Sequence, residues 1–303
     1  MAAFPAHAAV RFQSLDPGKN VNLGTWPGVG SMTLNVDFCA VSFSGNGQNA
    51  VSAPYQLRVA NQDAALVNAS FQLSNLNDPT QALLVDLDFI DQYSNGFETL
   101  SPNTWTAQDK TGALNQCPLG NNARILLTLQ EASLAAVFGG SYRGSFTVEA
   151  MGGDGGTESK STFFTINLTI NSLVQISGLN DFLFPFYLGS GDLSLSDSFC
   201  IYRNGAGTYQ VTLSGSGAGG AFVINNGIQD MPYQVTYDDG TGAVAVTANT
   251  PLTNRQNIFN ANLSCDGGIN NNATLALTLL QADLINASQG NYTGILTIMV
   301  APE

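Results

Sequence analysis

The sequence has few basic residues, a single histidine and no long hydrophobic run. It holds 9 Lys and Arg against 22 Asp and Glu, a formal net charge of -13. A surface of this charge repels phosphate backbones, so nucleic-acid binding is disfavoured. The only histidine is His7, which leaves no internal histidine for a catalytic triad, a proton shuttle or a zinc site. No apolar run approaches the roughly 18 residues of a membrane-spanning helix, so we expect no span.

The chain of 303 residues is long enough for two domains, and its hydrophobic residues make up 44% of the total. This composition predicts a globular protein. Residues 1–9 are small, apolar and uncharged and end in Ala-His-Ala-Ala, which is typical of the end of a secretory signal peptide. We therefore expect an exported protein; an ordinary cytosolic N-terminus is the alternative.

An internal repeat is the most informative feature of the sequence. Residues 121–148 align without a gap to residues 271–298, at an offset of 150, with twelve of 28 positions identical. The shared skeleton is Asn-Asn-Ala, Leu-Thr-Leu, Ala-x-Leu and Gly-x-Tyr-x-Gly-x-x-Thr. Phe-Cys also occurs upstream in both halves, at residues 38–39 and 199–200. The repeat predicts a tandem of two related domains.

The four cysteines follow the same repeat. Cys39 and Cys200 follow the same Phe, and Cys117 and Cys265 precede the same Asn-Asn-Ala strand. Four cysteines allow three pairings. Two related domains should each close their own loop, which favours Cys39 with Cys117 and Cys200 with Cys265. The alternative is four buried free thiols in a reducing compartment.

Short strands are expected throughout, because apolar and polar residues alternate, as in Phe164, Ile166, Leu168 and Ile170 against their neighbours. Turn residues separate these runs at intervals of roughly 8 to 12 residues, which predicts an all-β, immunoglobulin-like sandwich in each domain. Helical turns are expected at 132–138 and 282–288. The Gly-rich, charged stretch 151–161 is interpreted as the domain linker, which gives domains of residues 1–155 and 156–303.

The second half resembles the spore coat protein U family of pilin-like domains, in LSDSFCIYRNGAGTYQVTLSGSG, MPYQVTYDDG and the closing GNYTGILTIMVAPE. Domains of this family form archaic, Csu-type chaperone-usher pili. The resemblance implies a second domain that lacks its last strand, which a periplasmic chaperone and then a neighbouring pilus subunit supply after export through an outer-membrane usher. It implies a secreted cell-surface fimbrial protein with no enzyme activity and no cofactor. Residues 292–300 would form the last strand, with apolar side chains covered on both faces.

A two-domain member of this family resembles a tip adhesin that attaches cells to surfaces in biofilms. The first domain carries the aromatic insertion FIDQYSNGFETLSPNTW, absent from the second, and the apolar turns GTWPGVG and AAVFGG. Apolar loop tips on a rigid sandwich suit attachment to an apolar surface or a host ligand. The predicted binding residues, on loops at the end of domain 1 farthest from the linker, are Trp26, Val29, Phe97, Leu100, Trp105 and Phe138. Any of these rings could instead pack in the domain's own core.

Other functions stay open. A polymerising shaft subunit would donate an N-terminal strand, and apolar residues alternate at Phe4, Ala6, Ala8, Val10 and Phe12. A secreted carbohydrate-active protein would need two carboxylates at a defined separation. The pairs Asp86/Asp88 and Asp238/Asp239 could attract calcium, although neither has an EF-hand-like ligand series, so solvated turn carboxylates are the simpler interpretation.

Overall fold

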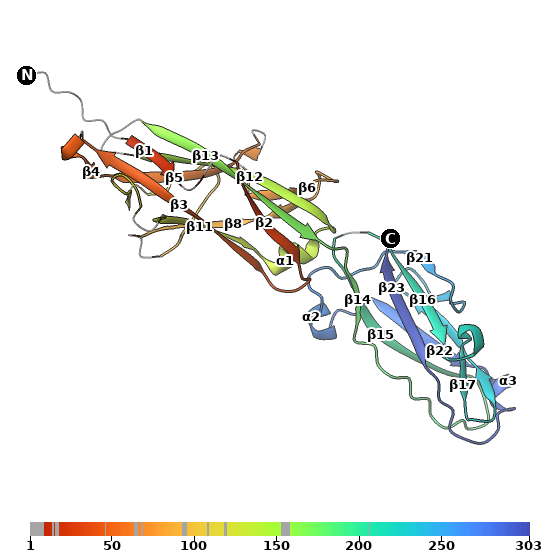
Figure 1. The fold of residues 1–303 in the computed structure, drawn as a ribbon. Coiled ribbons are helices and arrows are strands. Elements are labelled where there is room, and N and C mark those ends of the chain that lie inside the picture. The colour runs from red at the N-terminus through yellow and green to blue at the C-terminus, as the bar shows by residue number, and fades with distance from the viewer. Residues whose placement is uncertain are drawn as a thin grey trace, which may run out of the picture. The chain divides into compact units, whose positions relative to one another are not determined.

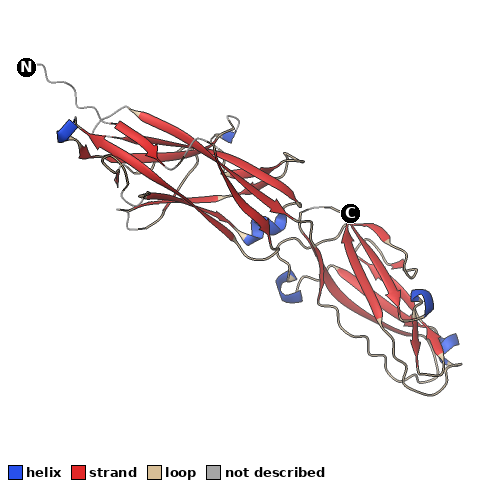
Figure 2. Ribbon diagram, viewed as in Figure 1, coloured by secondary structure: helices blue, strands red, loops and turns tan. Residues whose placement is uncertain are grey.

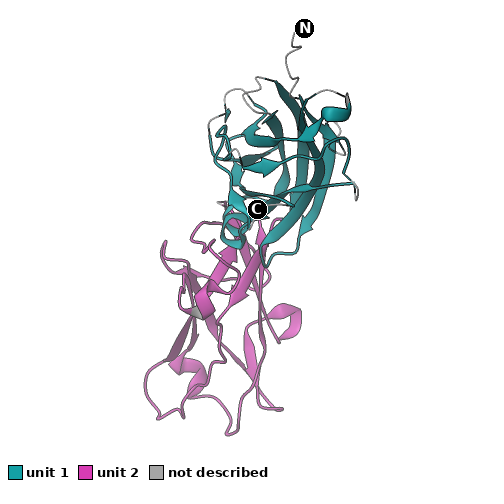
Figure 3. Cartoon of the chain, turned by 90° about the vertical axis from the view of Figure 1, so that its left-hand side faces the viewer, with its two compact units in different colours: residues 1–171 teal, residues 172–303 magenta. Residues whose placement is uncertain are grey.

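The computed structural model describes residues 9–13, 15, 18–45, 47–63, 66–67, 69–92, 96–107, 109–117, 120–152, 158–205 and 207–303. The chain divides into two compact units, Met1–Asn171 and Ser172–Glu303, here called domain 1 and domain 2 (Figure 3). Both are built almost entirely from strands (Figure 2). None of the described helices is long and apolar enough to cross a membrane. The expected all-β fold of two tandem sandwich domains is confirmed.

Domain 1 consists of two sheets (Figure 1). The first sheet contains, in spatial order, β1 (Ala9–Gln13), β3 (Met32–Ser44), β11 (Ala123–Leu129), β8 (Asp86–Asp91) and β9 (Glu98–Thr99), with β4 (Val51–Ser52) beside β3. The second sheet contains β10 (Lys110–Thr111), β5 (Pro54–Asn61), β12 (Gly140–Gly152), β13 (Ser159–Ile170) and β2 (Lys19–Trp26), with β6 (Gln72–Asn75) beside β12 and β7 (Ala82–Leu84) beside β6. A short helix, α1 (Glu131–Ala136), precedes β12, and a 3-10 turn, Gly47–Asn49, precedes β4.

Domain 2 repeats this plan with fewer strands. One sheet has the order β14 (Val174–Ser177), β15 (Leu193–Arg203), β22 (Ala273–Leu279), β19 (Gln234–Asp238) and β20 (Val244–Ala245). The other has the order β21 (Leu252–Arg255), β16 (Tyr209–Gly215) and β23 (Leu296–Pro302). The remaining elements are a hairpin of β17 (Val223–Asn225) and β18 (Asp230–Pro232), the helices α2 (Cys265–Gly268) and α3 (Gln281–Leu284), and a 3-10 turn, Ala218–Gly220.

The Asn-Asn-Ala motif has the same structural role in both domains. In domain 1 the side chain of Asn122 accepts from the backbone N–H of Ala40 at 2.8 Å and donates to its carbonyl at 3.0 Å. In domain 2 Asn272 makes the same two bonds to Ile201, at 2.7 and 2.9 Å. Each amide therefore bonds both backbone groups of the residue that follows a half-cystine and ties that residue to the start of the neighbouring strand.

The disulfides join Cys39 to Cys117 and Cys200 to Cys265, with Cα atoms 5.8 and 6.3 Å apart. The pairing predicted from the repeat is confirmed. Each bond closes a loop within one domain, and closing loops of this size limits the conformations of the unfolded chain, which stabilises each domain by about 4 kcal/mol.

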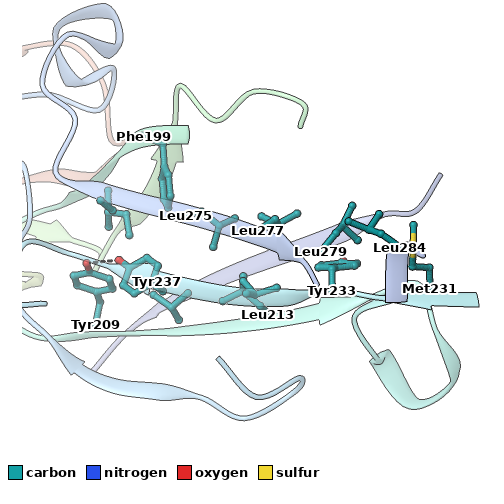
Figure 4. Packing of buried hydrophobic residues seen from close by; sticks show 14 residues of the cluster. Phe199, Tyr209, Leu213, Met231, Tyr233, Tyr237, Leu275, Leu277, Leu279 and Leu284 are labelled. Atoms are coloured by element: carbon teal, nitrogen blue, oxygen red, sulfur yellow. Dashed lines mark hydrogen bonds between the residues drawn. The ribbon is translucent and has the colours of Figure 1, made fainter. Parts of the chain in front are cut away.

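The core of domain 2 lies between its two larger sheets. Phe199 and three leucines of β15 and β22 face Tyr209 and Leu213 of β16, and Leu284 of α3 closes one end (Figure 4). All these side chains are at least nine-tenths buried. The helical turns expected at 132–138 and 282–288 form as α1 and α3, and each contributes one buried leucine.

The boundary between the domains differs from the prediction. The chain divides after Asn171 rather than after residue 155. The cause is β13, which follows the Gly-rich stretch and pairs with β12 from Gly140↔Ile170 to Met151↔Ser159. The stretch thus joins two strands of domain 1 instead of joining two domains, although residues 153–157 themselves lie outside the described residues.

Candidate functional site

Strand β23 has an unpaired edge. Within the described part of domain 2 it pairs with β16 only. Its counterpart at the offset of 150 is β12, which is flanked by β5 on one side and β13 on the other. Among the described residues of domain 2, no strand takes the place that β13 has in domain 1, and a strand in that place would lie antiparallel to β23.

The other border of this empty position is residues 182–192. They correspond without a gap to residues 21–31, which contain most of β2. Gly28 and Gly189 share a positive φ of 95° and 94°, and Gly30 and Gly191 one of 80° and 76°. The same helix cap follows: Ser31 Oγ accepts from Glu131 N at 3.1 Å, and Asp192 Oδ1 accepts from Gln281 N at 2.7 Å.

In domain 1 β2 pairs with β13 in parallel. In domain 2 the equivalent segment is not a strand, and no described strand of that domain is in a position to pair with it as β13 pairs with β2. We name the space between β23 and residues 182–192 the strand gap.

Strand β13 shows what the strand gap would accept. Four side chains of β13, Phe164, Ile166, Leu168 and Ile170, point into the core of domain 1 and are between 0% and 2% exposed. In domain 2 the inward side chains that border the gap are only half-buried, although they pack on the core. They are Phe182, Phe184, Tyr187, Leu296, Ile298 and Val300. An extended segment with apolar residues at alternate positions would bury both sets.

The faces of β23 alternate as the sequence predicted, but they are not both covered. Leu296, Ile298 and Val300 face the core, whereas Ile295 and Met299 are 70% and 62% exposed. No element of the described part of domain 2 lies over this outer face.

A buried polar cluster lies below one end of β23. Tyr209 pairs with Pro302 of β23, and its hydroxyl is 2.7 Å from that of Tyr237. Burial raises the pKa of Tyr209 to about 12 and also raises that of Tyr237, because the charged phenolate would lose its hydration. Both phenols stay neutral at pH 7, so they fix the local packing without adding charge.

Asp239 and Arg255 form the ion pair of this region. Asp239 is fully buried, and its carboxylate accepts from Thr241 Oγ1 at 2.5 Å and lies 3.4 Å from Arg255 Nη1. Burial works to raise the pKa of Asp239, but the hydrogen bonds from Thr241 and Gln256 and the charge of Arg255 together hold it below its usual value. The carboxylate of Asp239 therefore has a structural role, because its hydrogen bonds and ion pair hold the turn together.

The predicted binding residues of domain 1 divide into two groups. Val29 and Phe97 are 60% and 50% exposed, and Trp105 and Phe138 are half-buried. Trp26 and Leu100 are only 1% and 6% exposed, so the expectation that they point outward is wrong. Trp26 ends β2 and packs into the sandwich while its indole N–H donates to the carbonyl of Gly30 at 2.9 Å. Leu100 directly follows β9 and donates its backbone N–H to Leu87.

The residues also do not gather at the expected end of domain 1. Trp26 pairs with Ile170, and Gly140, two residues after Phe138, pairs with the same Ile170. The turns that carry Val29 and Phe138 therefore lie at the end where the chain leaves domain 1. Phe97 precedes β9, whose Glu98 pairs with Phe89 near the other end of β8.

Trp105 is held in place by a cation. The guanidinium of Arg58 lies 4.6 Å from the ring centroid of Trp105 and forms an ion pair of 2.6 Å with Glu149. Nearby, Lys110 is 5% exposed and bonds to Glu98 at 2.8 Å and Asp109 at 2.7 Å. Burial alone would lower the pKa of Lys110, but the two carboxylates raise it. These ion pairs tie the described residues around Trp105 and Glu98 to the sheets of domain 1.

Part of the candidate donor strand belongs to domain 1. Val10 is 2% exposed in β1, and Phe12 packs edge-on against Phe38 with the ring centroids 5.8 Å apart. The whole of β1 pairs with β3. Phe4, Ala6 and Ala8 lie outside the described residues. Val10 and Phe12 are therefore not free for donation to another chain.

The remaining candidate sites are a surface cavity and the two aspartate pairs that the sequence singled out. A surface cavity of about 410 Å³ in domain 1 is lined by one carboxylate among the described residues, Asp63. Asp86 accepts from Gln130 at 3.0 Å and Asp88 from Thr99 at 2.7 Å. Asp238 accepts from the backbone of two turn glycines. Within the described ranges, no three Asp, Glu, His or Cys side chains gather as a metal site.

No protein-family model and no curated protein sequence matches the chain. Solved structures similar to this chain include adhesins and pilins of chaperone-usher pili. One is a chain of the CsuC–CsuE chaperone–tip adhesion subunit pre-assembly complex of Acinetobacter baumannii, with 14% identity, a TM-score of 0.47 and 96% and 99% of the two chains covered. Another is CfaE, the adhesive subunit of CFA/I fimbria of enterotoxigenic Escherichia coli, with 13% identity, a TM-score of 0.37 and 95% and 93% covered. The CupB6 tip adhesin of Pseudomonas aeruginosa is similar at 10% identity, a TM-score of 0.36 and 97% and 95% coverage.

Proposed function

We propose that this chain is the two-domain adhesive subunit of a chaperone-usher pilus, exported through the periplasm to the cell surface. The strand gap of domain 2 is the observation that carries this function. A periplasmic chaperone supplies the missing strand first, and a neighbouring pilus subunit replaces it when the outer-membrane usher assembles the fibre. Domain 1 needs no such partner, because β13 completes its sheet.

Domain 1 contacts the target surface. Phe97 exposes apolar area beside β9 at the end of domain 1 away from the chain's exit, and Trp105 adds a ring that Arg58 orients. Apolar area removed from water stabilises attachment by about 25 cal/mol per Å², so such turns hold the cell on an apolar surface or host ligand and support biofilm growth.

The shaft-subunit alternative is less well supported. A shaft subunit must both accept and donate a strand, whereas Val10 and Phe12 of this chain are occupied in the sheet of domain 1. Withdrawing β1 would expose Phe38 and the neighbouring core.

A synthetic peptide of residues 159–170 tests the strand gap directly, because β13 fills the same position in domain 1. We expect the peptide to bind the full chain and to slow hydrogen exchange at the backbone amides of β23. A matched control peptide carries Ser at positions 164, 166, 168 and 170. If the two peptides leave the exchange at β23 equally fast, domain 2 is not a strand acceptor and the proposed function is wrong.

A further inference from the structure

The outer side of the strand gap is apolar on both borders. On one border Leu183, Phe186 and Leu188 are 83%, 91% and 92% exposed. On the other border Ile295 and Met299 are 70% and 62% exposed. Their neighbours in sequence pack on the core, so these five side chains point away from it. We name them the outer apolar face.

The equivalent positions of domain 1 are polar, which makes the outer apolar face of domain 2 unusual. The counterparts of Leu183 and Phe186 are Asn22 and Thr25, and both are exposed. The counterparts of Ile295 and Met299 are Ser145 and Glu149. The same sheet with its strand in place is therefore polar on its outer side, so filling the gap does not itself require an apolar outer face. A further layer must account for it.

We propose that the outer apolar face is a second contact surface for the assembly chaperone, which covers it with its folded body while one of its strands fills the gap. This inference rests on the proposed function. A single donated segment lies between the two borders and leaves both rows of outer side chains in water. A folded protein that donates this strand has a body beyond the strand, and the body can pack its own apolar side chains on both rows.

Charge specifies the chemistry of this partner surface. Residues 172–303 contain nine acidic residues and only two basic ones, Arg203 and Arg255. Asp181 and Asp192 flank the apolar row at Leu183 to Leu188 and are both exposed. The chaperone surface should therefore be an apolar patch with Lys or Arg at its rim, which would also speed the encounter.

The test uses the full chain and three residue changes that domain 1 itself suggests. The face variant carries Leu183→Asn, Phe186→Thr and Ile295→Ser. A matched control carries Ile228→Asn and Ile269→Asn, which replace side chains 87% and 82% exposed elsewhere in domain 2. Two binding constants are measured for each protein: one for the chaperone of the same pilus system and one for the peptide of residues 159–170.

We expect the face variant to bind the chaperone at least about tenfold more weakly, because losing some 60 Å² of apolar contact has this effect. Its affinity for the peptide should stay within about twofold of that of the unmodified chain, and the control should keep both affinities. Unchanged chaperone binding by the face variant would overturn the inference and leave the proposed function intact. Loss of both affinities would also overturn it, since the three side chains would then belong to the gap itself. An unmodified chain that binds neither probe would instead refute the proposed function.

Discussion

A strand appended to domain 2 should stabilise that domain and leave domain 1 unchanged. The design adds residues 154–170 of the same sequence directly after Glu303. At the offset of 150, Glu303 is the counterpart of residue 153, so the added strand enters the gap in the register that β13 has beside β12. The added Phe164 would then lie opposite Leu296, as Phe164 lies opposite Phe146 in domain 1.

The size of the effect follows from the side chains that become buried. Phe164, Ile166, Leu168 and Ile170 are at most 2% exposed in domain 1, and burying each contributes about 2 kcal/mol. The apolar strand should therefore stabilise domain 2 more than a strand with Ser at these positions. Each 1 kcal/mol of added stability raises the midpoint of thermal unfolding by about 4 °C in a domain of this size.

Differential scanning calorimetry of the full chain is the appropriate assay, because the two domains should unfold in separate transitions. One transition should move upward and the other should stay in place as an internal reference. The control carries Ser at the four apolar positions of the added strand. If the control raises the transition as much as the apolar strand does, or if neither raises it, the gap does not select an apolar strand and the reasoning fails.

Three further predictions concern replacements of individual side chains or of one disulfide. Phe97→Ser should reduce attachment to an apolar surface while changing the free energy of unfolding by less than about 0.5 kcal/mol, whereas Trp26→Ala should cost about 3–5 kcal/mol; equal effects on stability would contradict the two placements. Asp239→Asn should cost about 3 kcal/mol at pH 7, because it removes one partner of a buried ion pair. The folded-state pKa of Asp239 lies below its unfolded value, so its contribution is complete above the unfolded pKa and disappears as the pH falls through the folded one; denaturant titrations should therefore show the difference shrinking below about pH 4. Replacing Cys39 and Cys117 with Ser should destabilise domain 1 by about 4 kcal/mol, and an unchanged unfolding midpoint of that domain would argue against the disulfide.

The repeat allowed much of the fold to be predicted from sequence. Cysteines at repeated positions indicated which pairs join, and period-2 alternation indicated β13 correctly as a strand. The sequence-based prediction assigned the residues of β13 to domain 2, whereas they belong to domain 1. Glycine and charge in residues 151–161 suit a hairpin turn as well as a linker, and composition does not distinguish the two.

The prediction also failed for Trp26, which is buried although it stands beside a turn. Trp26 stands next to Pro27 and Gly28, so the sequence suggested an exposed loop tip. Its partner strand lies about 145 residues later in the chain, at Ile170, and no local pattern reveals so distant a neighbour. Half of the outer apolar face is visible in the sequence, because residues 182–192 aligned with 21–31 have Leu183 and Phe186 opposite Asn22 and Thr25.

The parallel pairing of β2 with β13 also has a consequence for the order in which the domains mature. Domain 1 must bring together residues about 145 positions apart, which is slow but depends on one molecule alone. In domain 2 the corresponding strand comes from a second molecule under the proposed function. Completion of domain 2 is then a second-order reaction, and its half-time shortens in proportion as the donor concentration rises. The two related domains would thus complete their folding at independent rates. Chain topology sets the rate for domain 1, and the donor concentration sets the rate for domain 2.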